Sequence, residues 1–151
     1  MSISKLYIKA TKKTPEIHFD PRNGQLVLKG KSIPENATRT YESTISWLKE
    51  YIKSPKQETN LHFDLMYFNT ATSIWIARMI KILSKINDRE KLLLINLYFD
   101  MEEFDEMEEQ DMQDAIAPVL DVVNEATVSL GVKIFGTDHT GARLKQRLIL
   151  I

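Results

Sequence analysis

The chain has 151 residues, of which 43% are hydrophobic and 27% are charged, and this composition is typical of one globular domain with its own core. Because it contains no cysteine, disulfides, thiolate catalysis and cysteine-based metal sites are excluded. The segment MSISKLYIKATKK lacks the apolar core of a signal peptide, and no apolar run approaches the roughly 18 residues of a membrane span. We therefore expect a cytoplasmic protein that does not associate with the membrane.

The net charge of −1 conceals an uneven distribution of charge. Residues 92–132 contain no lysine, arginine or histidine but hold 11 of the 21 acidic residues, so the rest of the chain carries 20 basic against 10 acidic residues. An acidic end on an otherwise basic molecule can orient a charged partner, whereas a solvated acidic loop would explain the same run without any function.

The first part of the chain predicts an N-terminal β-hairpin followed by a helix. Residues 6–10 alternate as a short edge strand does, and 16–19 and 25–29 flank the sequence Asp-Pro-Arg-Asn-Gly at 20–24. Proline presets one turn dihedral and Asn-Gly tolerates positive φ, so this segment is a strong hairpin signal. Apolar residues at helical spacing then predict a helix over 40–52.

The middle of the chain predicts a strand, a polar loop and a long amphipathic helix. Residues 61–68 are apolar and aromatic with partial alternation, which favours a central strand. The loop 69–73 holds three hydroxyls and an amide, the side chains that cap helix N-termini. An apolar stripe then continues from Trp75 to Ile86. A hydroxyl at this junction is expected to be exposed, where the helix dipole favours added negative charge.

The last third of the chain predicts strands on either side of an acidic segment. The nearly continuous apolar run 92–99 favours a strand buried on both faces. The acidic segment 100–114 is expected to begin as a loop and to become helical by about residue 111. Pro118 either kinks that helix or starts a new one, and a short strand follows at 132–135.

This order, a hairpin and then strands alternating with helices, predicts a single α/β domain over residues 1–151. It contains one mixed β-sheet with right-handed crossover helices, and 136–151 forms a C-terminal extension that fits either a helix or a strand. In such sheets the functional loops follow the carboxyl ends of the strands. If the strands 61–68 and 92–99 are neighbours, the hydroxyl loop and the acidic loop share one rim.

The motifs of common catalytic and cofactor sites are missing from the sequence. The three histidines are scattered and the acidic segment lacks EF-hand spacing, so we expect no metal site. There is no phosphate-binding glycine motif or nucleophile elbow, and the basic residues form no stripe typical of nucleic-acid binding. A non-catalytic protein without a cofactor is therefore expected. Two alternatives stay open: a small-molecule- or nucleotide-binding domain that uses the same rim, and a metal-dependent enzyme that uses the acidic loop.

Several short motifs resemble those of the SiaC-type bacterial regulatory phosphoproteins. They are Pro34-Glu35-Asn36, Trp47-Leu48 on the first helix, Tyr67-Phe68-Asn69-Thr70, and Tyr98-x-Asp100 before an acidic loop. Thr14-Pro15-x-Ile17 and Gly30-x-Ser32 agree as well, and the resemblance covers residues 14–114. It implies a fold like that of anti-sigma-factor antagonists (STAS-like) and no catalytic activity.

The resemblance also implies a threonine switch. In this family the threonine of the motif that reads Tyr-Phe-Asn-Thr here is the phospho-acceptor, which implies phosphorylation of Thr70. A serine/threonine protein kinase would add the phosphate and a PP2C-type phosphatase would remove it. The unmodified form would bind and activate an effector such as a diguanylate cyclase, which raises cyclic di-GMP and favours biofilm formation. Where the family continues Asn-Thr-Ser-Ser, this chain has Ala71 and Thr72, so Thr72 is either a second acceptor or the helix cap.

The predicted partner-binding surface combines residues from three segments. They are Asn69, Thr72 and Ser73 of the hydroxyl loop, Ser32, Pro34, Glu35 and Asn36 after the hairpin, and Asp100, Glu103 and Asp105 of the acidic loop. Phosphate on Thr70 beside an acidic rim would repel an acidic partner and attract a basic one. The residues by themselves also fit a simpler interpretation, in which Thr70 or Thr72 only caps the helix.

Overall fold

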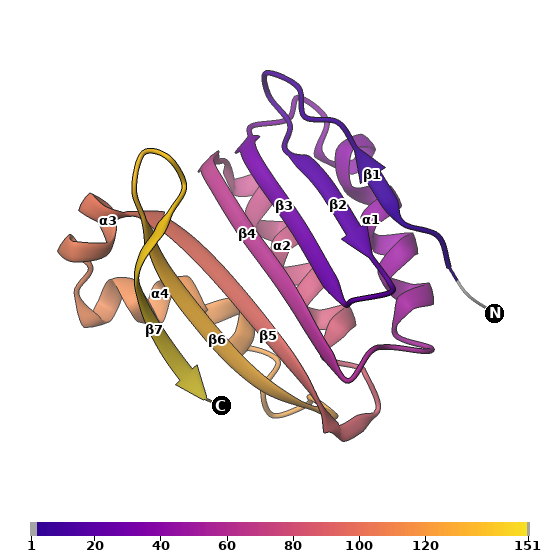
Figure 1. Cartoon of the computed structure of the whole chain (residues 1–151). Helices are drawn as coiled ribbons and strands as arrows, with labels where there is room; N and C mark the ends of the chain where they lie inside the picture. The colour runs from indigo at the N-terminus through magenta and orange to yellow at the C-terminus, as the bar shows by residue number, and fades with distance from the viewer. Residues whose placement is uncertain (1–2, 151) are drawn as a thin grey trace.

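The computed structural model describes residues 3–150, although not the side chains of 66–68 and 149–150, and in that part seven strands form one mixed sheet (Figure 1). The elements are β1 (Leu6–Ile8), β2 (Glu16–Asp20), β3 (Gln25–Ser32), α1 (Ala37–Tyr51), β4 (Glu58–Phe68), α2 (Thr70–Leu83), β5 (Asp88–Asp100), α3 (Met101–Glu106), α4 (Glu109–Leu120), β6 (Val128–Thr137) and β7 (Arg143–Leu150). The spatial order of the strands is their order along the chain. The predicted α/β fold with a single mixed sheet, an N-terminal hairpin and crossover helices is confirmed.

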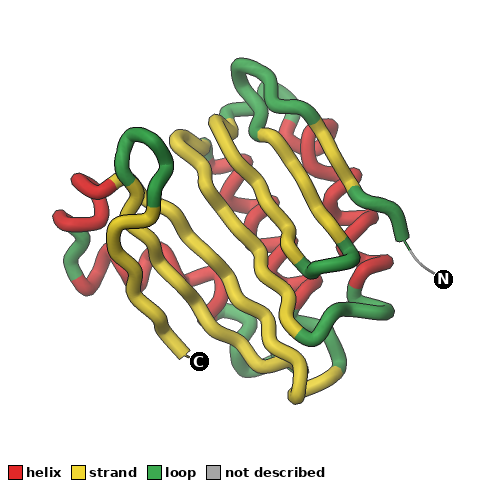
Figure 2. The backbone as a smooth tube through the Cα atoms, in the orientation of Figure 1, coloured by secondary structure: helices red, strands yellow, loops and turns green. Residues whose placement is uncertain are grey.

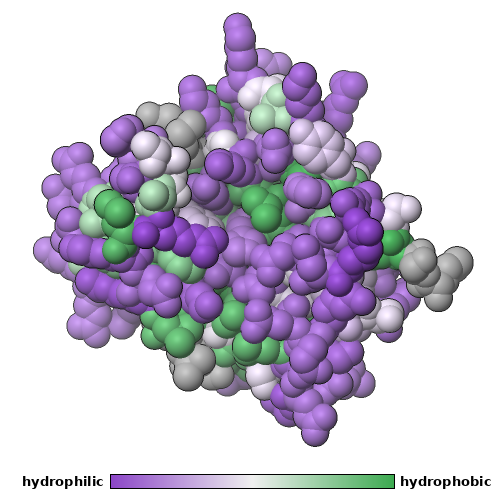
Figure 3. Space-filling view, in the orientation of Figure 1, coloured by the Kyte–Doolittle hydropathy of each residue, from purple (hydrophilic) through white to green (hydrophobic). Residues whose placement is uncertain are grey.

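The helices lie together on one face of the sheet. Strands β1, β2 and β3 are antiparallel neighbours, β3 to β6 run parallel, and β7 returns antiparallel to β6. Each parallel strand is added on the same side of the one before it, so right-handed crossovers place every connecting helix on the same face. Figure 1 shows α1, α2 and α4 behind the sheet, and the face toward the viewer is mainly hydrophilic in Figure 3.

The hydrophobic core fills the space between the sheet and the helices. Alternate strand residues point into it, as the two-residue period of a strand requires. The fully or nearly fully buried strand residues include Ile17, Phe19, Leu26, Leu28, Leu61, Phe63, Leu93, Ile95, Val132 and Ile134, and the helices add Tyr41, Leu48, Met79, Leu83, Ile116 and Val119. Burying each such side chain stabilises the fold by about 1.5–3 kcal/mol relative to leaving it in water.

Two helices begin earlier than the sequence predicts. α1 starts at Ala37 rather than at residue 40, because the Asn36 side chain caps it by accepting a hydrogen bond from the Arg39 amide at 3.1 Å. α2 starts at Thr70, so the predicted loop 69–73 is wrong beyond Asn69, and its hydroxyls belong to the first helical turn. In both cases an asparagine caps the helix. In the second segment three hydroxyl side chains follow the asparagine, and because each of them can also cap a helix, the sequence alone did not identify the cap.

The acidic segment is helical from its start, and the predicted loop there is wrong. The side chain of Asp100 caps α3 by accepting from the Glu103 amide at 2.8 Å, and Phe104 anchors this short helix with only 3% of its surface exposed. α4 begins at Glu109 and keeps Pro118 in its last turn. The extension that fitted either a helix or a strand continues β6 to Thr137 and forms β7.

The sheet divides at the carboxyl end of its parallel strands. β4 pairs with β5 only from Glu58–Leu92 to Phe63–Leu97, whereas β4 stays paired with β3 as far as Phe68. β5 continues along β6 to its last residue, Asp100. Figure 2 shows the two branches separating between β4 and β5. The loops that follow β4 and β5 therefore belong to different branches.

Candidate functional site: the first turn of α2

The segment around Thr70 is fixed to the end of the neighbouring strand β3. Ser32 and Phe68 are register partners at the last pair of the β3–β4 ladder. The backbone amide of Asn69 then donates to the carbonyl oxygen of Ser32 at 3.2 Å. The chain therefore leaves β4 and enters α2 with its position set by β3.

Asn69 is the N-cap of α2. Its side-chain oxygen accepts hydrogen bonds from both the backbone amide and the hydroxyl of Thr72, each at 3.0 Å. The first bond satisfies one of the backbone donors that every helix start leaves without a partner. The interpretation of Thr70 or Thr72 as the cap is therefore wrong, because Thr70 is the first helical residue and Thr72 is the third.

Thr72 belongs to a buried polar cluster. Its hydroxyl is 0% exposed and lies 2.7 Å from the Ser32 hydroxyl. Its single proton is shared between the Asn69 side-chain oxygen and the Ser32 carbonyl oxygen, which both lie at 3.0 Å. The Ser32 hydroxyl in turn contacts the Tyr41 hydroxyl of α1, and burial raises the pKa of Tyr41. This cluster connects β3, α1 and α2, and it keeps the Thr72 hydroxyl away from solvent.

Thr70 faces solvent on the same turn. Its side chain is exposed, as are those of Ser73 and Ile74, and Ile74 is 52% exposed. Ile33, the residue after Ser32, is 40% exposed. Sequence analysis did not select these two isoleucines, although Ile74 lies four residues after Thr70 and therefore on the same helix face. An exposed hydroxyl close to apolar surface is the main property of this site.

The predicted partner-binding residues near Thr70 divide into buried and exposed groups. Ser32 and Pro34 are buried, so they position the segment rather than cover its surface. Glu35 and Asn36 are exposed. Glu35 accepts from the Lys13 ammonium at 2.6 Å, and this contact lowers the pKa of the Glu35 carboxyl. Asn36 has its side-chain oxygen engaged as the cap of α1.

The acidic residues lie on the other branch of the sheet. Asp100 caps α3, and the Asp105 carboxylate accepts from the Lys145 ammonium of β7 at 2.9 Å. Burial, followed by the nearby Asp100, raises the pKa of Glu103. β4 and β5 are neighbours as the prediction required, but the ladder between them ends before either loop, and α3 packs on β5 and β6. The two loops therefore follow separate branches of the sheet.

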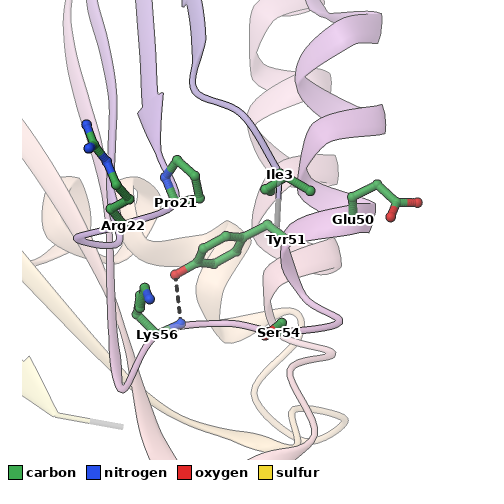
Figure 4. Close-up of a pocket in the computed structure, with 7 residues that line it drawn as sticks. All are labelled: Ile3, Pro21, Arg22, Glu50, Tyr51, Ser54 and Lys56. Carbon is green, nitrogen blue, oxygen red and sulfur yellow. Dashed lines mark hydrogen bonds between the residues drawn. The ribbon is translucent and has the colours of Figure 1, made fainter. Parts of the chain in front are cut away.

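Two hollows of the described structure lie away from Thr70. Figure 4 shows one of about 150 Å³, lined by Ile3, Pro21, Arg22, Glu50, Tyr51, Ser54 and Lys56. It lies at the start of β3 and β4, the opposite end of these strands from Thr70. A second hollow of about 200 Å³ is lined by Phe135 and four residues of β7. Across the described residues no group of three metal-ligating side chains comes together, and no helix there is long and apolar enough to cross a membrane.

The fold and this turn define a class of protein: a single-sheet α/β domain that presents one exposed threonine at a helix start, with its neighbouring threonine locked inside. The family model of the SiaC family regulatory phosphoproteins matches residues 8–124, and the chain belongs to this family. The resemblance to this family, which was inferred from the short sequence motifs, is confirmed.

Three similar proteins come from Pseudomonas aeruginosa. The chain is 25% identical over 118 residues to the uncharacterised protein PA14_02130 of strain UCBPP-PA14. This alignment spans 77% of this chain and 94% of that protein. The crystal structure of apo-SiaC matches with a TM-score of 0.64 at 24% identity, over 74% of this chain and 93% of that one. SiaC in complex with the diguanylate cyclase SiaD, which it activates, matches with a TM-score of 0.65 at 21% identity, over 83% and 97%.

Proposed function

We propose that this chain is a non-catalytic, cytoplasmic signalling protein whose unmodified form binds and activates a diguanylate cyclase, and that phosphorylation of Thr70 ends this binding. A serine/threonine kinase and a PP2C-type phosphatase would set the modified fraction. The observation that carries the proposal is the contrast between Thr70, which is exposed at the first helical position, and Thr72, which is fully buried. Membership of a family of regulatory phosphoproteins supports it.

The surroundings of Thr70 suit a switch that works without refolding. A phosphate adds nearly two negative charges, and the start of a helix tolerates them because its dipole is positive there. The cluster of Ser32, Tyr41 and Thr72 stays buried and need not move. The exposed Ile33 and Ile74 offer apolar surface to a partner. Docking against that surface would bury the phosphate and strip it of water, which is strongly unfavourable.

The modified residue is tested by tandem mass spectrometry on protein purified from its native host. The proposal requires phosphate on Thr70 and none on Thr72, and treatment with a PP2C-type phosphatase should remove it. Phosphate found only on other residues would contradict the proposal.

The effect on the partner is tested by calorimetric titration of a diguanylate cyclase from the same host. Thr70→Ala should bind as the unmodified protein does, and Thr70→Asp should bind about tenfold or more weakly, equivalent to about 1.4 kcal/mol. Ser46→Asp is the matched control, because it places the same charge on the exposed side of α1. Equal binding by all three variants would remove Thr70 from the interface.

A further inference from the structure

The strand β7 leaves a long edge of the sheet open. Among the described residues β7 pairs with β6 alone, and the side chains at 143–148 are all exposed. Leu144 and Leu148 are 57% and 51% exposed, which is high for leucine. Figure 1 shows β7 at the outer edge of the sheet, next to the C-terminus. The other edge strand, β1, has three residues against eight in β7.

An open strand edge is a template for another strand. Every second residue of an edge strand directs its N–H and C=O groups away from the sheet, where an extended segment can pair with them. The SiaC family model ends at residue 124, before β6 and β7 begin. This edge therefore lies outside the part of the chain that the family model matches.

The side chains of β7 give the edge a positive charge. Arg143, Lys145 and Arg147 alternate along the strand, and no acidic residue follows Asp138 in the sequence. Lys145 reaches Asp105 of α3, and the Arg147 guanidinium lies 5.2 Å from the centre of the Phe104 ring, so both project on the helix side of the sheet. Gln146 and Leu148 are register partners of Phe135 and Lys133 and lie on the opposite, open side.

The third cation, Arg143, lies on the open side, because a register shift between Gly136 and Thr137 places Arg143 opposite Thr137 while Lys145 lies opposite Gly136. The Arg143 guanidinium lies 4.6 Å from the centre of the Phe135 ring and donates to the Tyr98 hydroxyl at 2.7 Å. These contacts hold the start of β7 against β5 and β6. The edge is therefore presented by an anchored strand, which lowers the ordering cost that a partner strand must overcome.

The charge of the edge decides what can pair with it. In an antiparallel pair of two copies of this chain with the two-fold axis at Gln146, Lys145 of each copy would face Arg147 of the other, and like charges directly opposite are destabilising. Lysine on an edge strand is one of the ways in which proteins prevent self-pairing. A strand with acidic residues at the matching positions would instead gain attraction.

We propose that β7 is a docking edge for an extended acidic segment of a partner protein, which adds to the sheet as an eighth strand. Its aspartate or glutamate residues lie beside Lys145 and Arg147 on the helix side. Its apolar residues alternate with them and cover Leu148 on the open side. The partner segment thus has alternating acidic and apolar residues, and it binds independently of the turn that carries Thr70.

The test uses the full chain and a synthetic, end-blocked peptide of alternating glutamate and valine. Calorimetric titration should show binding that weakens as salt is added, and hydrogen exchange should show slower exchange at β7 amides when the peptide is present. A peptide of alternating lysine and valine should bind at least about tenfold more weakly. Equal binding of the two peptides, or no slowing at β7, would overturn the proposal.

Variants separate this edge from other basic surface. The double variant Lys145→Glu with Arg147→Glu should lose binding of the glutamate peptide and gain binding of the lysine peptide. The double variant Lys81→Glu with Lys85→Glu makes the same charge change at exposed sites near the end of α2, and it should bind as wild type does. The neutral variant Lys145→Gln with Arg147→Gln should give an intermediate affinity, and it keeps the test valid if the reversed variant fails to fold.

Two further outcomes concern the occupant and the switch. If the chain without peptide forms a dimer in sedimentation experiments, and the β7 amides exchange more slowly in that dimer than in the monomer, a second copy occupies the edge and the proposal is wrong. Thr70→Asp should leave peptide affinity unchanged. Unchanged peptide affinity in this variant supports a site that is independent of Thr70. The proposal for β7 and the proposal for Thr70 are therefore tested separately, and either can be wrong without the other.

Discussion

The hydroxyl oxygens of Ser32 and Thr72 lie 2.7 Å apart although 40 residues separate them in the sequence. Both side chains are 0% exposed, and the Tyr41 hydroxyl extends the contact to α1. The bond connects the end of β3 to the first turn of α2. Because Thr72 points inward at this contact, Thr70 on the same turn is left facing solvent. The burial of one threonine and the accessibility of the other therefore have the same structural cause.

The two threonines should differ in their contribution to stability. Thr72→Val keeps the shape of the side chain but removes its hydroxyl, which leaves buried polar groups of the cluster without a partner. We expect the free energy of unfolding to fall by about 1–3 kcal/mol. Thr70→Val should change it by less than about 0.5 kcal/mol, because the residue is exposed. Urea denaturation measures both, and equal losses would contradict the assignment of Thr72 to a buried network.

The two asparagine caps give a matched comparison. Asn36→Ala and Asn69→Ala each remove a side-chain oxygen that accepts from the backbone amide three residues later, which costs about 1 kcal/mol. Asn69 also accepts from the Thr72 hydroxyl. We therefore expect the larger loss of unfolding free energy for Asn69→Ala, with Asn69→Asp retaining most of the stability. A larger loss at Asn36 would show that the second bond of Asn69 contributes nothing.

Much of the fold could be predicted because its signals are local. The Asn-Gly turn predicted the β2–β3 hairpin, and two-residue or helical periodicity predicted the parallel strands and the helices between them. The candidate site was predicted at Asn69 and Thr70, and in the structure a strand ends and a helix begins at these residues. The details of that turn were not predictable to the residue, because four potential capping side chains stand in sequence and only tertiary contacts select among them. The Thr72 hydroxyl is hydrogen-bonded to that of Ser32, a residue 40 positions away.

The features that sequence analysis missed depend on distant contacts. The sheet divides where the β4–β5 ladder ends, and no local sequence pattern predicts the position of that end. The acidic helix α3 looks like a solvated loop in the sequence, and it forms because Phe104 packs against Gly136 of β6. The sequence of the last strand fits two structures, because Leu144 and Leu148 have helical spacing whereas the final apolar run suits a strand. In the structure this segment pairs with β6 and is therefore a strand.

Gly136 should be essential for the packing of α3. A β-carbon at this position would lie 2.7 Å from the Met101 sulfur and 2.9 Å from Cγ of Phe104, both shorter than van der Waals contact allows. We expect Gly136→Ala to lower the free energy of unfolding by about 1–3 kcal/mol through overpacking, and to speed hydrogen exchange in α3. Adding Met101→Ala removes the nearest atom and should restore part of the loss. A neutral Gly136→Ala variant would show that α3 does not pack this closely.

His62 should make stability depend on pH. It is 9% exposed on the open face of the sheet, with Nδ1 lying 2.7 Å from the Tyr98 hydroxyl and Nε2 lying 2.7 Å from the side-chain oxygen of Gln25. The amide oxygen of Gln25 accepts, so the neutral ring donates from Nε2 and accepts at Nδ1. Burial, with smaller effects from Arg143 and Lys133, lowers the pKa of His62 from 6.5 to about 4.

The direction of the pH effect follows from this lowered pKa. Between about pH 4 and pH 6.5 the unfolded chain binds a proton at His62 that the folded protein does not, so the free energy of unfolding rises with pH across this window. The contribution lost on acidification to pH 4 is at most about 3 kcal/mol. Denaturation at several pH values should show this slope in wild type and a shallower one in His62→Gln. His139→Gln, at an exposed turn, is the control and should keep the wild-type slope. If the free energy of unfolding depended on pH equally in wild type and His62→Gln, folding would not lower the pKa of His62.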